Sequence, residues 1–119
     1  MTEVLDLARL LPEHPLPDRV SANEFALAVV AQLAKDFHWD LEKVSESRVS
    51  ILQLLENEIE WGFDRNPTGL FGAFYRLDLG EPLIRKILDE NERPKAIQLL
   101  AFNSLQRACL KVWTRLQYS

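Results

Sequence analysis

Apolar side chains recur at helical spacing along three stretches of the chain that hold neither glycine nor an internal proline. The first opens at Ser21, where Ser-Ala-Asn-Glu forms a capping box, because the Ser21 hydroxyl can accept from the amide of Glu24 while the Glu24 carboxylate reaches back. Its pattern predicts a helix to about Phe37. Asp40 is expected to cap a second helix over about 41–61, and Pro94 opens a third over about 94–117.

The last of these stretches has the broadest apolar surface. Taking 100° per residue, its apolar positions cover roughly 200° of the helical wheel. A stripe of this width is typical of a central helix that several neighbours contact. The residues on its main apolar side are Ile97, Leu100, Ala101, Leu105, Ala108, Val112 and Leu116.

Shorter elements are expected between the long helices. Residues 2–11 predict a short helix that Pro12 ends, and 12–20, with three prolines, predict an extended arm lying across the surface of something else. Residues 62–69 predict a loop, and a short apolar helix follows from Leu70 to Leu77. Glu81-Pro82 then opens a helix over about 81–90.

These elements predict an all-α fold. We expect a single helical domain over residues 1–119, a bundle of three long and two or three short helices. No apolar run approaches the ~20 residues that a membrane span needs, so no membrane association is expected. The chain has one cysteine, Cys109, which excludes an intramolecular disulfide and a Cys-based zinc site and makes the cytoplasm the default location.

Charge is distributed unevenly along the chain, whose net charge is −4. Residues 21–61 carry eight acids and three bases, a net −5, whereas 93–119 carry five bases and no acid, a net +5. Arg107, Lys111 and Arg115 recur every four residues and form one ridge. This ridge can complement an acidic helix and the helix dipole, or it can bind an acidic partner or phosphates. The pI of about 5.2 argues against nucleic acid as the main ligand.

Arg48 falls inside the apolar stripe of the predicted 41–61 helix. A guanidinium there must be paired or must reach solvent, because burying it alone costs several kcal/mol. The structural interpretation is an ion pair with another helix or a stem that covers apolar surface. The functional alternative is an anion-binding arginine in a pocket between helices.

The residues that usually carry catalysis or metal binding do not form recognisable motifs. His14 and His38 belong to no metal-ligand spacing, the serines to no nucleophile elbow and the glycines to no phosphate loop. The carboxylates around Glu58 are typical of a solvated face, and Cys109 of a buried apolar position. No catalytic residue, metal or cofactor is therefore expected. The three tryptophans and two tyrosines lie near predicted helix ends, where they either close the bundle or form a partner interface.

The stretch Asn66–Glu81, NPTGLFGAFYRLDLGE, resembles a segment of small uncharacterised bacterial helical proteins, in which Leu-Phe and Tyr-Arg-Leu-Asp-Leu-x-Glu precede a final helix. That final helix is similar to Asn103–Tyr118 here. The resemblance covers about 30 of 119 residues and implies a helical fold and a bacterial origin, but no activity. It marks Tyr75, Arg76, Asp78 and Arg115 as candidate site residues.

The sequence therefore favours a non-enzymatic protein that acts through a protein partner or through self-association. The alternative is a small ligand-binding or enzymatic bundle whose pocket is lined by Arg48 and by residues such as Asp64, Arg65 or Tyr75. A third hypothesis, nucleic-acid binding through the ridge, is less favoured. The candidate binding residues are Arg48, Arg76, Arg107, Lys111 and Arg115.

Overall fold

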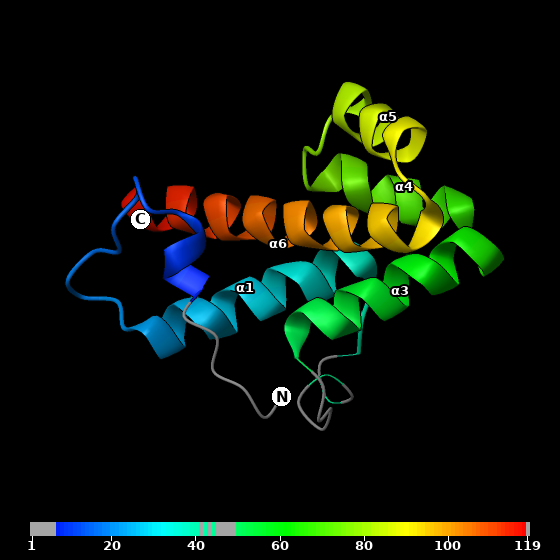
Figure 1. Ribbon diagram of the computed structural model, residues 1–119. Coiled ribbons are helices and arrows are strands. Elements are labelled where there is room, and N and C mark those ends of the chain that lie inside the picture. Colours follow the sequence, from blue (N-terminus) through cyan, green and yellow to red (C-terminus); the bar gives the residue numbers. More distant parts are fainter. Residues whose placement is uncertain (1–6, 41, 43, 45–49, 119) are drawn as a thin grey trace.

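The computed structural model describes residues 7–40, 42, 44 and 50–118. Within this part of the chain it has five α-helices, one short 3-10 helix and no strand, so the predicted all-α fold is confirmed (Figure 1). The elements in chain order are η1 (Leu7–Leu10), α1 (Ala22–Phe37), α3 (Ile51–Arg65), α4 (Pro67–Arg76), α5 (Glu81–Glu90) and α6 (Arg93–Gln117).

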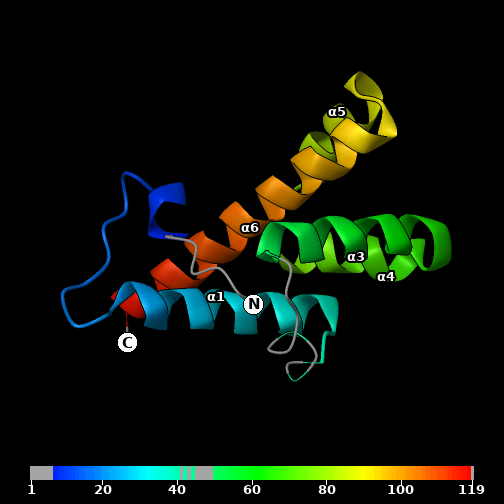
Figure 2. The same cartoon turned by 60° about the horizontal axis from the view of Figure 1, so that its bottom comes forward.

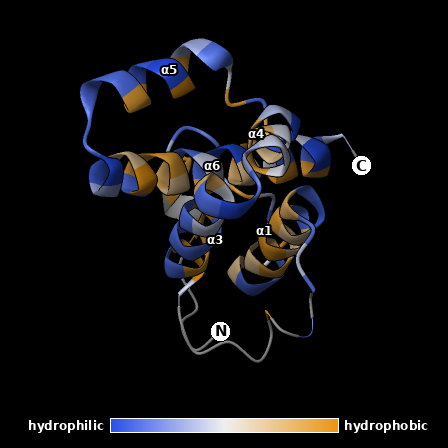
Figure 3. Cartoon of the chain, turned by 90° about the vertical axis from the view of Figure 1, so that its right-hand side faces the viewer, coloured by the Kyte–Doolittle hydropathy of each residue, from blue (hydrophilic) through white to orange (hydrophobic). Residues whose placement is uncertain are grey.

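Helix α6 crosses the whole molecule and is the element around which the others pack (Figures 1 and 2). It contacts α1, α3, α5 and η1, while α4 rests on α1 and α3. α1 and α3 both carry apolar stretches, drawn orange in Figure 3, and both pack against α6. Leu100, Leu105 and Val112 are completely or almost completely buried, and each such side chain contributes about 1.5–3 kcal/mol. The prediction of a central final helix is confirmed.

The helix starts that rest on local capping signals are also confirmed. Glu24 donates its backbone N–H to the Ser21 hydroxyl at 3.1 Å, and Ser21 donates its own to the Glu24 carboxylate at 3.2 Å. Pro82 and Pro94 lie in the first turns of α5 and α6, which run as predicted to within one residue. Asp40 accepts the backbone N–H of Glu42 at 3.0 Å, as an N-cap does.

The continuous helix predicted over 41–61 is wrong. Glu42 and Val44 have helical backbone, but Ser50 is extended, with φ −66° and ψ 162°. Its hydroxyl accepts the N–H of Gln53 at 3.2 Å and starts a new helix, α3, at Ile51. A serine hydroxyl competes with helical hydrogen bonds in this way, and here it decides the boundary.

The loop predicted over 62–69 is also wrong, because only Asn66 leaves the helical conformation there. α3 continues to Arg65 and α4 begins at Pro67, so α4 starts three residues earlier than predicted. Asn66 makes this sharp corner possible, since its side-chain oxygen accepts the N–H of Gly69 at 3.1 Å and caps α4.

The proline-rich segment between η1 and α1 lies against α6 of its own chain. Trp113 donates its indole N–H to the carbonyl of Pro15 at 3.0 Å, and the His14 ring packs edge-on against the same indole at 4.5 Å between centroids. Two turns shape the segment, closed by hydrogen bonds from His14 to Leu11 and from Val20 to Pro17. Residues 2–6 of the predicted first helix lie outside the described residues.

Candidate functional site

The principal cavity is a groove between the end of α1, one side of α3 and the first half of α4. Its volume is about 690 Å³, in the range of binding pockets for small molecules. Apolar side chains dominate its described lining, with Phe37 and Trp39 from the α1 end, Leu54 and Trp61 from α3 and Leu70 from α4. Trp61 is 56% exposed, although it is among the largest apolar side chains of the protein.

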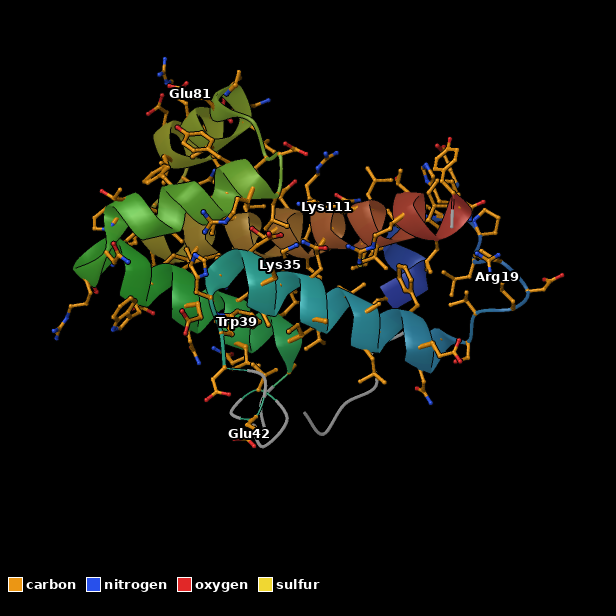
Figure 4. All side chains as sticks on the ribbon, turned by 180° about the vertical axis from the view of Figure 1, so that it is seen from behind. Arg19, Lys35, Trp39, Glu42, Glu81 and Lys111 are labelled. Atoms are coloured by element: carbon orange, nitrogen blue, oxygen red, sulfur yellow. The ribbon has the colours of Figure 1, made fainter. Side chains whose placement is uncertain are left out.

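The α1 wall of the groove depends on an unusual backbone conformation at His38. This residue has φ 59° and ψ 42°, the left-handed conformation that ends many helices. His38 and Trp39 both donate their backbone N–H groups to the carbonyl of Ala34, the latter at 2.8 Å. The turn folds Trp39, labelled in Figure 4, back toward the helix. Its ring stacks on Phe37, with 5.5 Å between centroids and 26° between planes.

The opposite wall depends on the close approach of α3 and α4. A Cβ atom on Gly62 would lie 2.9 Å from the Cβ of Leu70, so only glycine fits between the two helices at this point. Both residues line the groove, as does Asn66 at the corner. The width of the groove therefore depends in part on Gly62 and Asn66, which the sequence pattern assigned to a loop.

The charged side chains in the described lining of the groove are acidic. Asp40 and Glu58 line it, and no described lysine or arginine does. Neither carboxylate forms an ion pair with a described residue, whereas Glu81, Asp64, Asp78 and Asp36 each lie within 4.0 Å of a basic nitrogen. Within this part of the chain, the groove combines exposed apolar surface with unpaired negative charge.

A second cluster of polar residues joins α1, α4 and α6 on another side of the α1 end. We call it the clamp, and it consists of Gln32, Asp36, Arg76, Lys111 and Arg115. The Asp36 carboxylate is almost fully buried and accepts from Gln32 at 2.9 Å. The Lys111 ammonium lies 3.7 Å from the same carboxylate, and Arg115 donates to the Gln32 side-chain oxygen at 2.9 Å.

Arg76 also contacts the His38 ring, with 3.4 Å between Nη2 and Nε2, and the other contacts of the clamp involve backbone carbonyls near helix ends. Arg76 donates twice to the carbonyl of Asp36, at 3.1 and 2.6 Å, and Lys111, labelled in Figure 4, donates to the carbonyl of Arg76 at 2.7 Å. Arg107 donates to the carbonyl of Leu77 at 3.2 Å, beside the clamp. Carbonyls in the last turn of a helix lack helical donors and carry the negative end of the dipole, which explains why cations gather here.

The sequence-predicted site residues thus fall into two groups. Arg76, Arg107, Lys111 and Arg115 all bind groups of their own chain around the ends of α1 and α4. Arg48 lies outside the described residues, so its predicted pocket is not described. Of the other residues proposed for that pocket, Asp64 pairs with Arg93 at 2.7 Å, and neither Asp64, Arg65 nor Tyr75 lines the groove.

Sequence reasoning did not identify the groove, although two of its signals were present. Trp39 and Trp61 stand out as aromatic residues near helix ends. They are 22 positions apart, and nothing in their spacing indicates that they line one cavity. That follows from the left-handed turn at His38 and from the α3–α4 corner, both of which are tertiary features.

Groups that would support catalysis do not converge among the described residues. Burial raises the pKa of the Cys109 thiol from its ordinary 9.0 to about 12, so the thiol stays neutral. No set of three His, Cys, Asp or Glu side chains in the described ranges has a geometry that could hold a metal ion. Helices long and apolar enough to cross a bilayer are likewise absent from the described part of the chain.

Comparison with known proteins gives no relative from which function could be inferred. No protein-family model matches the chain, and neither the curated proteins nor the solved structures contain a match.

Proposed function

We propose that this protein is a non-enzymatic binding protein whose groove receives a segment of another protein. The observation that carries the proposal is the apolar groove of about 690 Å³ with Trp61 exposed at it. Large aromatic side chains in a concave surface are the residues that most often dominate binding energy at protein interfaces. A cytoplasmic location is part of the proposal, because a chain whose single cysteine is free and buried needs no oxidising compartment for disulfide formation.

The absence of converging reactive groups in the described residues favours binding over catalysis. Hydrogen bonds there join no thiol or hydroxyl nucleophile to a general base, which covalent hydrolases require. Binding of nucleic acid through Arg107, Lys111 and Arg115 has less support. All three side chains are engaged by their own chain, which leaves them fewer donors for phosphates.

The proposal is tested with two matched variants. Trp61 and Tyr75 are 56% and 54% exposed, but only Trp61 lines the groove. The immobilised chain is used to isolate a partner from an extract of its source cells, and the purified partner is then titrated by calorimetry. We expect Trp61→Ala to weaken binding by at least tenfold and Tyr75→Ala by less than twofold.

Equal effects of the two substitutions would contradict the groove as the binding site. Sedimentation of the chain alone provides the second measurement. A dimer that Trp61→Ala dissociates would identify the occupant as a second copy and overturn the proposal of a different partner. A monomer that retains no protein from the extract would also overturn it.

A further inference from the structure

The shape of the groove restricts the kind of peptide that it can hold. Its α3 wall runs from Leu54 to Trp61, seven residues or about 10 Å of helix at 1.5 Å per residue. This length matches two turns of a second helix lying alongside. The described residues include no strand, so they offer no sheet edge to which an extended peptide could add. An amphipathic helix packed into an apolar groove is a peptide-binding mode that hides apolar surface on both sides, and it fits the length of the α3 wall.

The charge of the groove restricts the sequence of that helix. Asp40 lies at the end of the α1 wall and Glu58 on α3, so negative charge comes from two sides of the groove. Asp40 uses one carboxylate oxygen to accept from Glu42, and Glu58 has no hydrogen bond with a described residue. Among the described residues no basic side chain lines the groove, so within this part of the chain these two carboxylates are the charges that a ligand can neutralise.

We infer that the occupant is a basic amphipathic α-helix of the partner protein. Its apolar side chains, spaced i, i+3 or i+4 and i+7, pack against Trp61, Leu54 and Leu70. Lysine or arginine side chains at the edge of that apolar face pair with Asp40 and Glu58. This inference rests on the proposed function, and it specifies the chemistry that the groove recognises.

The test uses four labelled synthetic peptides of 16 residues, a length chosen at about four helical turns. Three share one leucine face and differ in a polar face of lysine, glutamine or glutamate. The fourth is the lysine peptide with a central proline, which prevents helix formation. Fluorescence anisotropy at about 0.15 M salt measures their affinities. We expect the lysine helix to bind most tightly, the glutamine helix less tightly, and the other two not measurably.

Two double variants locate the charge effect. Asp40→Asn with Glu58→Gln removes two charges at the groove, whereas Asp89→Asn with Glu90→Gln removes two exposed charges on α5. We expect the groove pair to weaken the lysine helix by about five- to tenfold, and the α5 pair by less than twofold. Thermal melts verify that both variants remain folded.

Three results would overturn the inference. They are lysine and glutamate helices of equal affinity, no measurable binding of the lysine helix, or double variants with equal effects. The proposed function is judged separately, by the loss of the natural partner in Trp61→Ala. A partner that depends on Trp61 but not on the two carboxylates would leave the proposed function standing and refute the basic helix.

Discussion

Two regions meet at the end of α1, and they differ in whether their polar groups are paired within the chain. In the clamp, the buried carboxylate and the carbonyl of Asp36 are both satisfied, by Gln32, Lys111 and Arg76. In the groove, to which the chain contributes Trp39 and Asp40 three and four residues further along, the rings of Trp39 and Trp61 are incompletely buried, and Asp40 has no basic partner among the described residues. The clamp carries stability because its groups are paired within the chain, whereas the groove has unpaired groups that a partner can use.

The largest expected effect is the difference in Cys109 reactivity between the folded and the unfolded chain. Cys109 lies on α6, the helix that supplies Lys111 and Arg115 to the clamp. With a pKa of about 12 in place of 9.0, its thiolate at pH 8 is about a thousandfold rarer in the folded chain than in the unfolded one. We expect an aromatic disulfide reagent to label the native protein at least a thousandfold more slowly than the urea-unfolded protein.

The same pKa shift gives a direction for the pH dependence. Between pH 9 and 12 the unfolded thiol ionises while the folded one keeps its proton, so unfolding is favoured as pH rises through this window. Comparison with Cys109→Ala isolates this contribution from that of lysine and tyrosine. If the native protein were labelled as fast as the unfolded protein, Cys109 on α6 would not be protected by burial in the folded chain.

Removal of the buried carboxylate should be the most damaging substitution in the clamp. Asp36→Ala leaves the Gln32 amide buried without its acceptor, and we expect a loss of about 2 kcal/mol in the free energy of unfolding. The contact with Lys111 adds little to this, because Lys111 is 38% exposed. Urea denaturation measures the loss. Asp36→Asn, which keeps an oxygen acceptor for Gln32, should lose less than half as much, and equal losses would refute this role of the hydrogen bond.

On the groove side, the stability of the α3–α4 contact should depend on the volume of the side chain at position 62. Gly62→Ala forces the new Cβ against Leu70, which costs about 1–3 kcal/mol, while helix propensity returns up to about 1 kcal/mol. We expect a net loss of about 1 kcal/mol and weaker partner binding, because the groove must widen. Gly72→Ala is the matched control. Its Cβ would lie 3.2 Å from the Arg76 guanidinium, which needs to shift by only a few tenths of an ångström, so the loss should be smaller than for Gly62→Ala.

The two regions also differ in how far the sequence could predict them. Local signals correctly placed the starts of α1, α5 and α6, because a capping box and two first-turn prolines act within a few residues. The residues of the ridge could be placed on one helix, but periodicity does not show that the end of α4 lies beside them. The width of the groove depends on contacts such as Gly62 with Leu70, whose effect only the folded chain reveals.

The smallest effect on stability is expected for the Glu58 carboxylate of the groove. Glu58→Gln should change the free energy of unfolding by less than about 0.5 kcal/mol, because the carboxylate has no partner to lose among the described residues and is not fully buried. Urea denaturation beside Asp36→Asn makes the comparison direct, since both substitutions neutralise one acid. A loss above about 1 kcal/mol for Glu58→Gln would mean that the chain itself uses this charge, and the distinction between a self-satisfied clamp and an unsatisfied groove would fail.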